Sequence, residues 1–292
     1  MAPRNVSFVT RLDYMRFFPI FLDLLPVSYF LRHTDWVDVN SAIVIAALIV
    51  GLLVGLTGVG AGAAMTPILV SFFGVPLPTA IATDLLFATI TKAVGVAAHG
   101  KSGSVNWQLT KKLWAGSIPA VLLGSMFLVG FVVAGHTHWL TLLLVAFVAF
   151  TSFSLLQRAL RPNQTARLIH KSKAPRWLAP IGGAGVGLGV SLTSVGAGVL
   201  GMALLVRLSP DNTPPQRLVA TDLLHAIPIA LIGGTSYAIS GLVDFELLLW
   251  LLIGSIPGVI LGALSSKWIP PRALNLTLGL VLATMAVVLV LG

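Results

Sequence analysis

The chain has 292 residues, of which 57% are apolar and only 9% are charged, and its mean hydropathy is +0.97. Soluble domains are roughly 45–50% apolar and about 25% charged, so this composition excludes an ordinary water-soluble protein and predicts a chain that folds in lipid. The formal net charge is +9, but the basic residues gather at the ends of apolar runs without interleaved aromatic side chains. That pattern favours topology signals and contacts with lipid headgroups, not nucleic-acid binding. The absence of cysteine excludes disulfides and thiolate chemistry.

The first segment, residues 1–38, is a leader of mixed composition. Its apolar stretch at 17–31 is short and is interrupted by Pro19, Asp23 and Pro26. Such a stretch is typical of either an interfacial helix or a marginal crossing, so both remain open for residues 17–33.

A charge-free apolar run then covers residues 41–74. As one straight helix it would measure about 50 Å against a hydrocarbon core of about 30 Å. The run must therefore bend or break, and Gly58, Gly60 and Gly62 weaken ordinary helix near its middle. A second over-long run, at 178–206, carries a similar glycine motif.

Six further apolar runs are each close to the length of one membrane crossing. They cover residues 79–99, 113–133, 139–156, 218–239, 247–265 and 273–291. Together with the two over-long runs, they predict an all-α polytopic membrane protein with broken or re-entrant helices at its glycine-rich motifs.

The chain is also predicted to be an internal duplication. Four sequence blocks recur in the same order: 59–62 (VGAG) at 195–198, 82–86 (ATDLL) at 220–224, 103–107 at 241–245, and 116–119 (GSIP) at 254–257. Fixed order and near-constant spacing are the signature of repeated structural units. We therefore expect a first repeat at 39–160, a basic linker at 161–176 and a second repeat at 177–292.

Charge predicts the orientation of the repeats. The linker contains basic residues and no acid, which places it in the cytoplasm by the positive-inside rule. If the run 178–206 crossed once, the following loops would invert that rule. If it turns back at its glycines, Arg207 and Arg217 stay inside and the acidic pair Asp244 and Glu246 lies outside. The second arrangement is favoured, and it makes the two repeats inverted, a common plan of secondary transporters.

The glycine motifs are the first candidate site. A broken helix exposes backbone N–H groups and a positive dipole end, which suit an anion, and glycine lets the ligand approach closely. The alternative is that these glycines only allow tight helix packing. The candidate substrate-binding residues are Thr57, Gly58, Gly60 and Gly62 in the first repeat and Thr193, Ser194, Gly196 and Gly198 in the second.

Charged residues inside the apolar runs are the second candidate. Asp84 and Asp222 occupy matching positions of the two repeats, and Lys92 follows Asp84 by eight residues on roughly the same helical face. Intramembrane charges are costly and usually face partners or cavities. Lys92 is therefore a candidate counter-charge for an anion, and the two aspartates are candidates for proton coupling. The alternative is a structural ion pair, or aspartates that stabilise helix N-termini.

His225 lies one turn after Asp222 and is either a proton relay or a hydrogen-bonded packing residue. The sequence has no metal-binding spacing of histidines or carboxylates and no phosphate-binding P-loop. We therefore expect no metal, no cofactor and no ATP-driven pump.

These motifs resemble the TauE/SafE sulfite-exporter family of membrane permeases. The resemblance rests on the glycine-rich break followed by Pro67, the A-T-x-L block at 82–85 after Pro78, and a helix ending in Ala98-His99 before a Gly-x-Val-x-Trp loop. It implies a bacterial inner-membrane carrier for sulfite, sulfonates such as sulfoacetate, or related anions. The family pattern often has serine where Asp84 and Asp222 stand, and a Lys–Asp pairing with Lys92 would explain the change.

The predicted function is thus a secondary transporter that exports a small sulfur-containing anion by alternating access. An anion channel of the same architecture and an uptake carrier for another small organic anion are the alternatives, and an enzyme is not expected. The expected partners are the small anion and the lipid bilayer, and a homodimer is compatible with this architecture.

Overall fold

The computed structural model of the protein describes residues 37–57, 64–99, 105–133, 135, 138–160, 175, 177–195, 198–210, 213–266 and 271–291. The chain divides into two compact units, residues 1–43 and 44–292, and the account below concerns the second. The predicted interfacial or crossing segment at 17–33, and all of the linker 161–176 except residue 175, lie outside the described residues.

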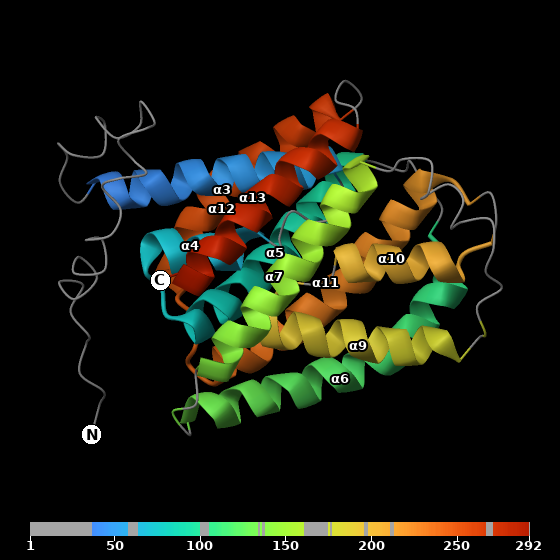
Figure 1. Ribbon diagram of the computed structural model, residues 1–292, viewed down its shortest axis with the longest axis horizontal. Coiled ribbons are helices and arrows are strands. Elements are labelled where there is room, and N and C mark those ends of the chain that lie inside the picture. Colours follow the sequence, from blue (N-terminus) through green and yellow to red (C-terminus); the bar gives the residue numbers. More distant parts are fainter. Residues whose placement is uncertain are drawn as a thin grey trace. The chain divides into compact units, whose positions relative to one another are not determined.

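All regular secondary structure in the described residues is helical (Figure 1). The ten helices found there are α3 (Val37–Thr57), α4 (Met65–Phe73), α5 (Leu77–His99), α6 (Trp107–Val133), α7 (His138–Leu160), α9 (Leu178–Thr193), α10 (Val199–Leu208), α11 (Pro215–Ile239), α12 (Phe245–Ser265) and α13 (Pro271–Leu291).

Seven helices of the described part are long and apolar enough to cross a bilayer: α3, α5, α6, α7, α11, α12 and α13. Their outer faces carry large apolar side chains, such as Met126 at 72% exposure and Leu264 at 69%, whereas Asp84 and Asp222 are buried. Apolar residues outside and charges inside are the arrangement that lipid favours. The chain is therefore an all-α polytopic membrane protein, as its composition predicts.

Helix α6 begins earlier than the apolar run at 113–133 indicates. Its first turn contains Trp107 and Gln108, and the Asn106 side chain accepts a hydrogen bond from the Leu109 backbone N–H at 3.2 Å. An N-terminal cap of this kind starts a helix independently of hydrophobicity. Asp244 starts α12 in the same way, with its carboxyl accepting from the Leu247 N–H at 3.0 Å.

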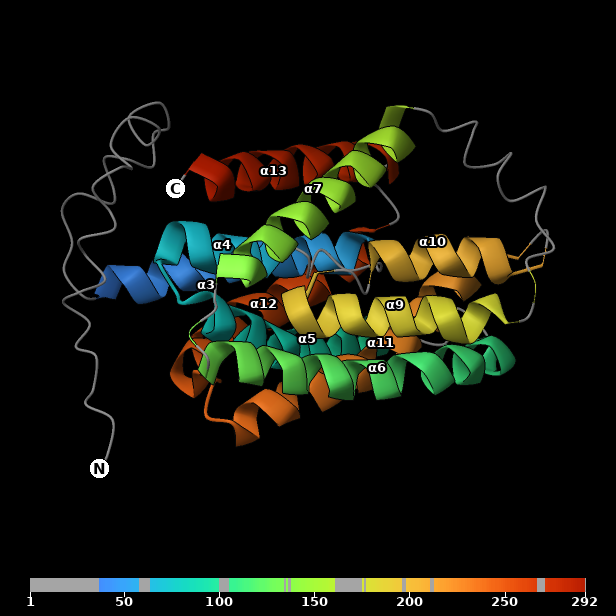
Figure 2. The ribbon, with the colours of Figure 1, turned by 60° about the horizontal axis from the view of Figure 1, so that its bottom comes forward.

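Both over-long apolar runs are broken at their glycine motifs, as predicted. Helix α3 ends at Thr57 and α4 begins at Met65, and α9 ends at Thr193 before α10 begins at Val199. Figures 1 and 2 show α9 and α10 side by side, so the chain turns back between them. Neither α4 nor α10, with 9 and 10 residues, is long enough to cross a bilayer.

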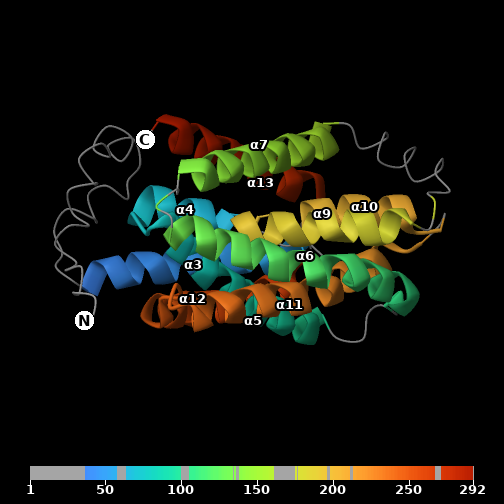
Figure 3. The same ribbon diagram turned by 90° about the horizontal axis from the view of Figure 1, so that it is seen from below.

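The helices that carry the repeated GSIP block pack against the broken helices of the opposite half. Helix α6 lies along α9 (Figure 3), and a Cβ added to Gly116 would collide with the Pro180 carbonyl. Helix α12 packs against α3 in the equivalent way. A Cβ added to Gly254 would collide with the Val44 carbonyl, so the two backbones touch there. Small residues let these backbones touch, which is how helices associate where lipid removes the hydrophobic driving force.

Two equivalent hydrogen bonds also join the two halves. The Asn106 backbone N–H donates to Thr221 Oγ1 at 3.1 Å, and the Asp244 backbone N–H donates to Thr83 Oγ1, also at 3.1 Å. These four residues occupy equivalent positions of the duplicated sequence. The two bonds are therefore reciprocal, because each half donates a backbone N–H to the threonine of the other.

Helices α7 and α13, the last of each half, lie side by side (Figure 2). Ser152 on α7 donates to the Gly279 carbonyl at 2.8 Å, and Gly279 gives the Leu156 side chain room against the α13 backbone. A buried hydroxyl that finds a backbone acceptor fixes the register of the two helices.

Candidate functional site

The candidate site begins with two buried aspartates on the paired helices α5 and α11. Asp84 is 0% exposed and Asp222 is 1% exposed, and Lys92, two turns after Asp84, is 5% exposed. A charge that is removed from water is very unfavourable unless other groups stabilise it. The contacts of these three side chains therefore decide what the site can do.

Asp84 lies at the N-terminus of the half-helix α4. Thr66, the second residue of α4, donates from Oγ1 to Asp84 Oδ2 at 2.5 Å, and the Thr66 backbone adds a hydrogen bond. The Ser194 hydroxyl, on the other broken helix, acts electrostatically on the same carboxyl but does not meet the geometry of a hydrogen bond. Asp84 therefore interacts with one residue from each of the two broken helices.

Asp222 has the equivalent place at the half-helix α10. Its Oδ1 lies so close to Gly201, in the first turn of α10, that a Cβ there would collide with it. The cap positions of the two half-helices, Ala64 and Gly198, provide no side-chain hydrogen bond. The carboxyls of Asp84 and Asp222 therefore lie where the positive ends of α4 and α10 attract negative charge. This position agrees with helix-end stabilisation, one of the three interpretations of the aspartates.

Lys92 interacts electrostatically with both aspartates. The structure thereby brings together the three intramembrane charges that the sequence singles out, from α5 and α11. Arg158 of α7 also acts on Asp222, and sequence reasoning missed it. Arg158 lies in the last turn of a crossing helix, and a basic residue at that position is typical of a topology signal.

His225, one turn after Asp222, is fully buried. Its Nε2 is 3.1 Å from Ser117 Oγ of α6, and its backbone carbonyl accepts a hydrogen bond from Trp114 Nε1 at 3.2 Å. Its Nδ1 has no hydrogen-bond partner. His225 therefore joins α11 to α6 through one ring nitrogen and leaves the other unsatisfied inside the protein.

The residues at the breaks have mixed contacts. Thr57 Oγ1 donates to the Leu53 carbonyl at 2.8 Å and Thr193 Oγ1 to the Gly189 carbonyl at 2.7 Å, so both hydroxyls are bonded to their own helices. Ser194 ends α9 in the left-handed conformation, with φ 55°, which strains a residue that is not glycine. Gly198 is the residue before α10. Gly58, Gly60, Gly62 and Gly196 lie outside the described residues.

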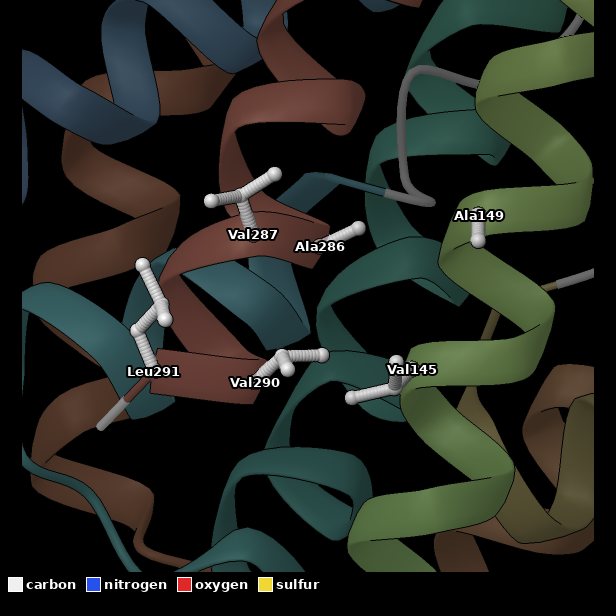
Figure 4. A pocket seen from close by; sticks show the side chains of 6 residues that line it. All are labelled: Val145, Ala149, Ala286, Val287, Val290 and Leu291. Atoms are coloured by element: carbon white, nitrogen blue, oxygen red, sulfur yellow. The ribbon is translucent and has the colours of Figure 1, made fainter.

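A shallow cavity of about 260 Å³ lies elsewhere, between α7 and α13 (Figure 4). Its lining is entirely apolar and consists of Val145, Ala149, Ala286, Val287, Val290 and Leu291. Nothing in it can hold an anion, so this cavity does not compete with the buried charges as a transport site. Within the described residues no group of three or more histidines, carboxylates or cysteines is placed to hold a metal ion.

The sequence model of the family described as "Sulfite exporter TauE/SafE" matches residues 43–289. The chain belongs to the TauE/SafE family. This match covers both predicted repeats and begins after the leader. It confirms the family resemblance that the glycine, A-T-x-L and Gly-x-Val-x-Trp motifs indicate.

Relatives from Bacillus subtilis (strain 168) support this TauE/SafE assignment. The chain is 36% identical over 245 residues to the "Probable membrane transporter protein YjnA", with 80% of this chain and 93% of that protein covered. It is 27% identical over 244 residues to the "Probable membrane transporter protein YdhB", with the same coverage. No solved structure matches the chain. The protein is thus a multi-pass membrane transporter of the TauE/SafE family, and a transporter fits the expectation that it is not an enzyme.

Proposed function

We propose that this TauE/SafE transporter carries a small sulfur-containing anion, sulfite or an organosulfonate such as sulfoacetate, across the bacterial inner membrane by alternating access. One observation supports this proposal most strongly: the N-termini of two broken helices meet one buried ionic cluster, formed by Asp84, Asp222 and Lys92. Export is the proposed direction, since the membrane potential, positive outside, favours the exit of anions.

Physical chemistry favours an anion at this cluster. The residues that precede α4 and α10 make no side-chain cap hydrogen bond, and backbone N–H groups at helix N-termini bind oxyanions strongly where water is excluded. Lys92 adds a buried positive charge that interacts with both carboxylates. An oxyanion with several acceptor oxygens, such as sulfite or a sulfonate, matches this set of donors.

The proposed binding residues surround the two breaks. They are Thr57, Gly58, Gly60 and Gly62 in the first half, Thr193, Ser194, Gly196 and Gly198 in the second half, and Lys92. Ser194 is the strongest of the hydroxyl candidates, because its Oγ is buried without a hydrogen-bond partner, whereas Thr57 and Thr193 already donate to backbone carbonyls.

Alternating access requires two halves that can rock about a central site. We propose that residues 39–160 and 177–292 are inverted repeats in the bilayer. The reciprocal packing of α6 on α9 and α12 on α3 supports this proposal. It makes Gln108 and Glu246, which are exposed at equivalent positions of the halves, face opposite sides of the membrane.

Single cysteines test this orientation, because the natural chain has none. In intact cells an impermeant maleimide should label Glu246→Cys, whereas Gln108→Cys should be labelled only after the cells are permeabilised. Labelling of both from the same side would mean that the repeats are parallel and would remove this basis for alternating access.

Counterflow in proteoliposomes tests the transport activity. Vesicles that contain the full chain and unlabelled sulfite should accumulate labelled external sulfite with saturable kinetics, and excess sulfoacetate should compete. An anion channel would instead carry current without exchange. Counterflow of another small organic anion, with none of sulfite or sulfoacetate, would disprove the proposed substrate class.

A further inference from the structure

The Asp222 carboxyl occupies the place at α10 that the proposed function gives to the transported anion. Its Oδ1 lies against Gly201 in the first turn of α10, it is 1% exposed, and that oxygen has no hydrogen-bond partner. Its counterpart Asp84 differs, because Thr66 donates to one of its oxygens. Each aspartate thus has a buried Oδ1 without a hydrogen-bond partner, but only the Oδ1 of Asp222 lies against the first turn of a half-helix, at Gly201.

The charges around Asp222 come from several helices. Lys92 of α5 and Arg158 of α7 act on it, Asp84 acts on the same lysine, and His225 follows it on α11. The other charged side chains described on the helices packed against α11 point outward: Lys111 and Lys112 on α6 and Arg207 on α10 are exposed. The cluster therefore contains two buried carboxylates, the buried Lys92 and the half-buried Arg158, and these charges balance when all four groups are ionised.

This balance leaves little net attraction for a second anion. An added anion would meet Asp222 at the α10 N-terminus and would compete with it for Lys92. Like charges that share one low-dielectric site repel each other strongly, and the site relaxes when one of them binds a proton.

We propose that Asp222 is a tethered competitor of the transported anion, and that the anion binds when Asp222 takes up a proton. This inference rests on the proposed function. A proton from the aqueous side forms an O–H bond with a carboxylate oxygen of Asp222, the cluster gains one positive charge, and the anion then binds at the α10 N-terminus and Lys92. Proton and anion therefore move together, and a divalent anion such as sulfoacetate with one proton still carries one net negative charge, so the membrane potential still favours its exit. The anion leaves when Asp222 releases its proton on the other side.

The first test measures proton uptake by the purified full-length protein. Sulfoacetate is a suitable probe because its carboxyl titrates near about pH 4 and its charge is constant between about pH 6 and about pH 8. In weakly buffered detergent solution with a pH indicator, its binding should take up about one proton per molecule bound. Its affinity should fall at least tenfold over the same pH range, as calorimetry would measure.

The equivalent aspartates provide matched variants. Asp222→Asn carries an amide that cannot ionise, so we expect it to bind sulfoacetate without proton uptake and with less than a twofold change in affinity between those pH values. Asp84→Asn should keep the proton uptake, because Asp222 is intact. If Asp84→Asn loses proton uptake and Asp222→Asn keeps it, the assignment to Asp222 is wrong.

The outcomes separate this inference from the proposed function. Wild-type protein that binds sulfoacetate with no proton uptake would overturn the role of Asp222 and leave the anion transporter intact. If neither binding nor counterflow of sulfite and sulfoacetate occurs, the proposed function itself fails. Should Asp222→Asn not fold, absence of proton uptake by the wild-type protein, or its loss in Asp84→Asn, still overturns the assignment to Asp222.

Discussion

The two halves of this transporter share their packing and their buried aspartates, but not the other ionisable residues of the site. In both halves a GSIP helix lies along the broken helix of the other half, and a threonine accepts a backbone hydrogen bond across the interface. The aspartates are also shared, at 84 and 222. Lys92 and His225, however, stand where the other half has Ala230 and Phe87.

The difference between residues present in both halves and residues present in only one separates the features needed for folding from those proposed for transport. A duplicated scaffold needs its small residues and backbone contacts twice, because each half packs on the other. The proposed site at their junction has Lys92 and His225 in one copy each, so the two similar half-helices have unequal partners. Changes at the shared packing residues should therefore affect folding, and changes at the unshared Lys92 and His225 should affect transport.

The largest expected effect is on folding, at the shared glycines. Leucine at position 187 would force its Cβ into the Ser117 carbonyl of α6, so Gly187→Leu should destabilise the protein by about 3 kcal/mol or more. Gly51→Leu should do the same against Ser255. The control is Gly185→Leu on the same helix, where nothing lies within 4 Å. Thermal unfolding in detergent measures all three, and an unaffected Gly187→Leu would contradict the packing account.

Next in size is the loss of the unshared cation. Lys92→Gln removes the charge that acts on both aspartates, so sulfite counterflow should fall by about tenfold to a hundredfold, or about 1.4–2.7 kcal/mol. Lys111→Gln removes an exposed lysine and serves as the control. Equal counterflow in the two variants would show that Lys92 does not contact the anion.

A smaller effect is expected at the unshared histidine. His225→Phe installs the residue that the first half has at position 87 and removes the hydrogen bond to Ser117. We expect net proton-coupled transport to slow by about threefold to tenfold, from the loss of about 1 kcal/mol of hydrogen bonding, while counterflow changes less than twofold. If both rates fall equally, His225 is a packing residue and not a proton relay.

The smallest effects are expected at the paired serines of the GSIP motifs. Ser117 is bonded to His225, whereas the Ser255 hydroxyl is buried without a hydrogen-bond partner. Ser117→Ala should therefore cost about 1 kcal/mol, and Ser255→Ala should be neutral or stabilising by up to about 1 kcal/mol. Differential scanning fluorimetry on the two variants compares them directly, and equal shifts of Tm would remove this distinction between the halves.

Much of the fold can be predicted from the sequence, because lipid permits a chain only a few kinds of backbone structure. Apolar length marks the crossings, and over-long runs with glycines mark the breaks at 58–62 and 194–198. The early start of α6 at Trp107 escapes a hydropathy argument, because an Asn106 cap and not apolarity begins that helix. The packing of each half against the broken helix of the other half also cannot be predicted from the sequence, because a repeated motif does not indicate which copy it contacts.

The candidate site follows from the sequence only in part. Intramembrane charge singles out Asp84, Lys92 and Asp222, because such charges are costly wherever they occur. Thr66 and Ser117 look like ordinary helix residues until the structure places them beside Asp84 and His225. Their partners are 18 and 108 residues away, and no local pattern reports such distances.

The most direct test of the account is an experimental structure of the full chain with sulfoacetate bound. Density for the anion should lie between the first turns of α4 and α10, with its oxygens within hydrogen-bond distance of Lys92 and Ser194. The same data should show the Asp222 carboxyl displaced from Gly201. An anion bound away from both half-helix N-termini, with Asp222 still against Gly201, would contradict the account.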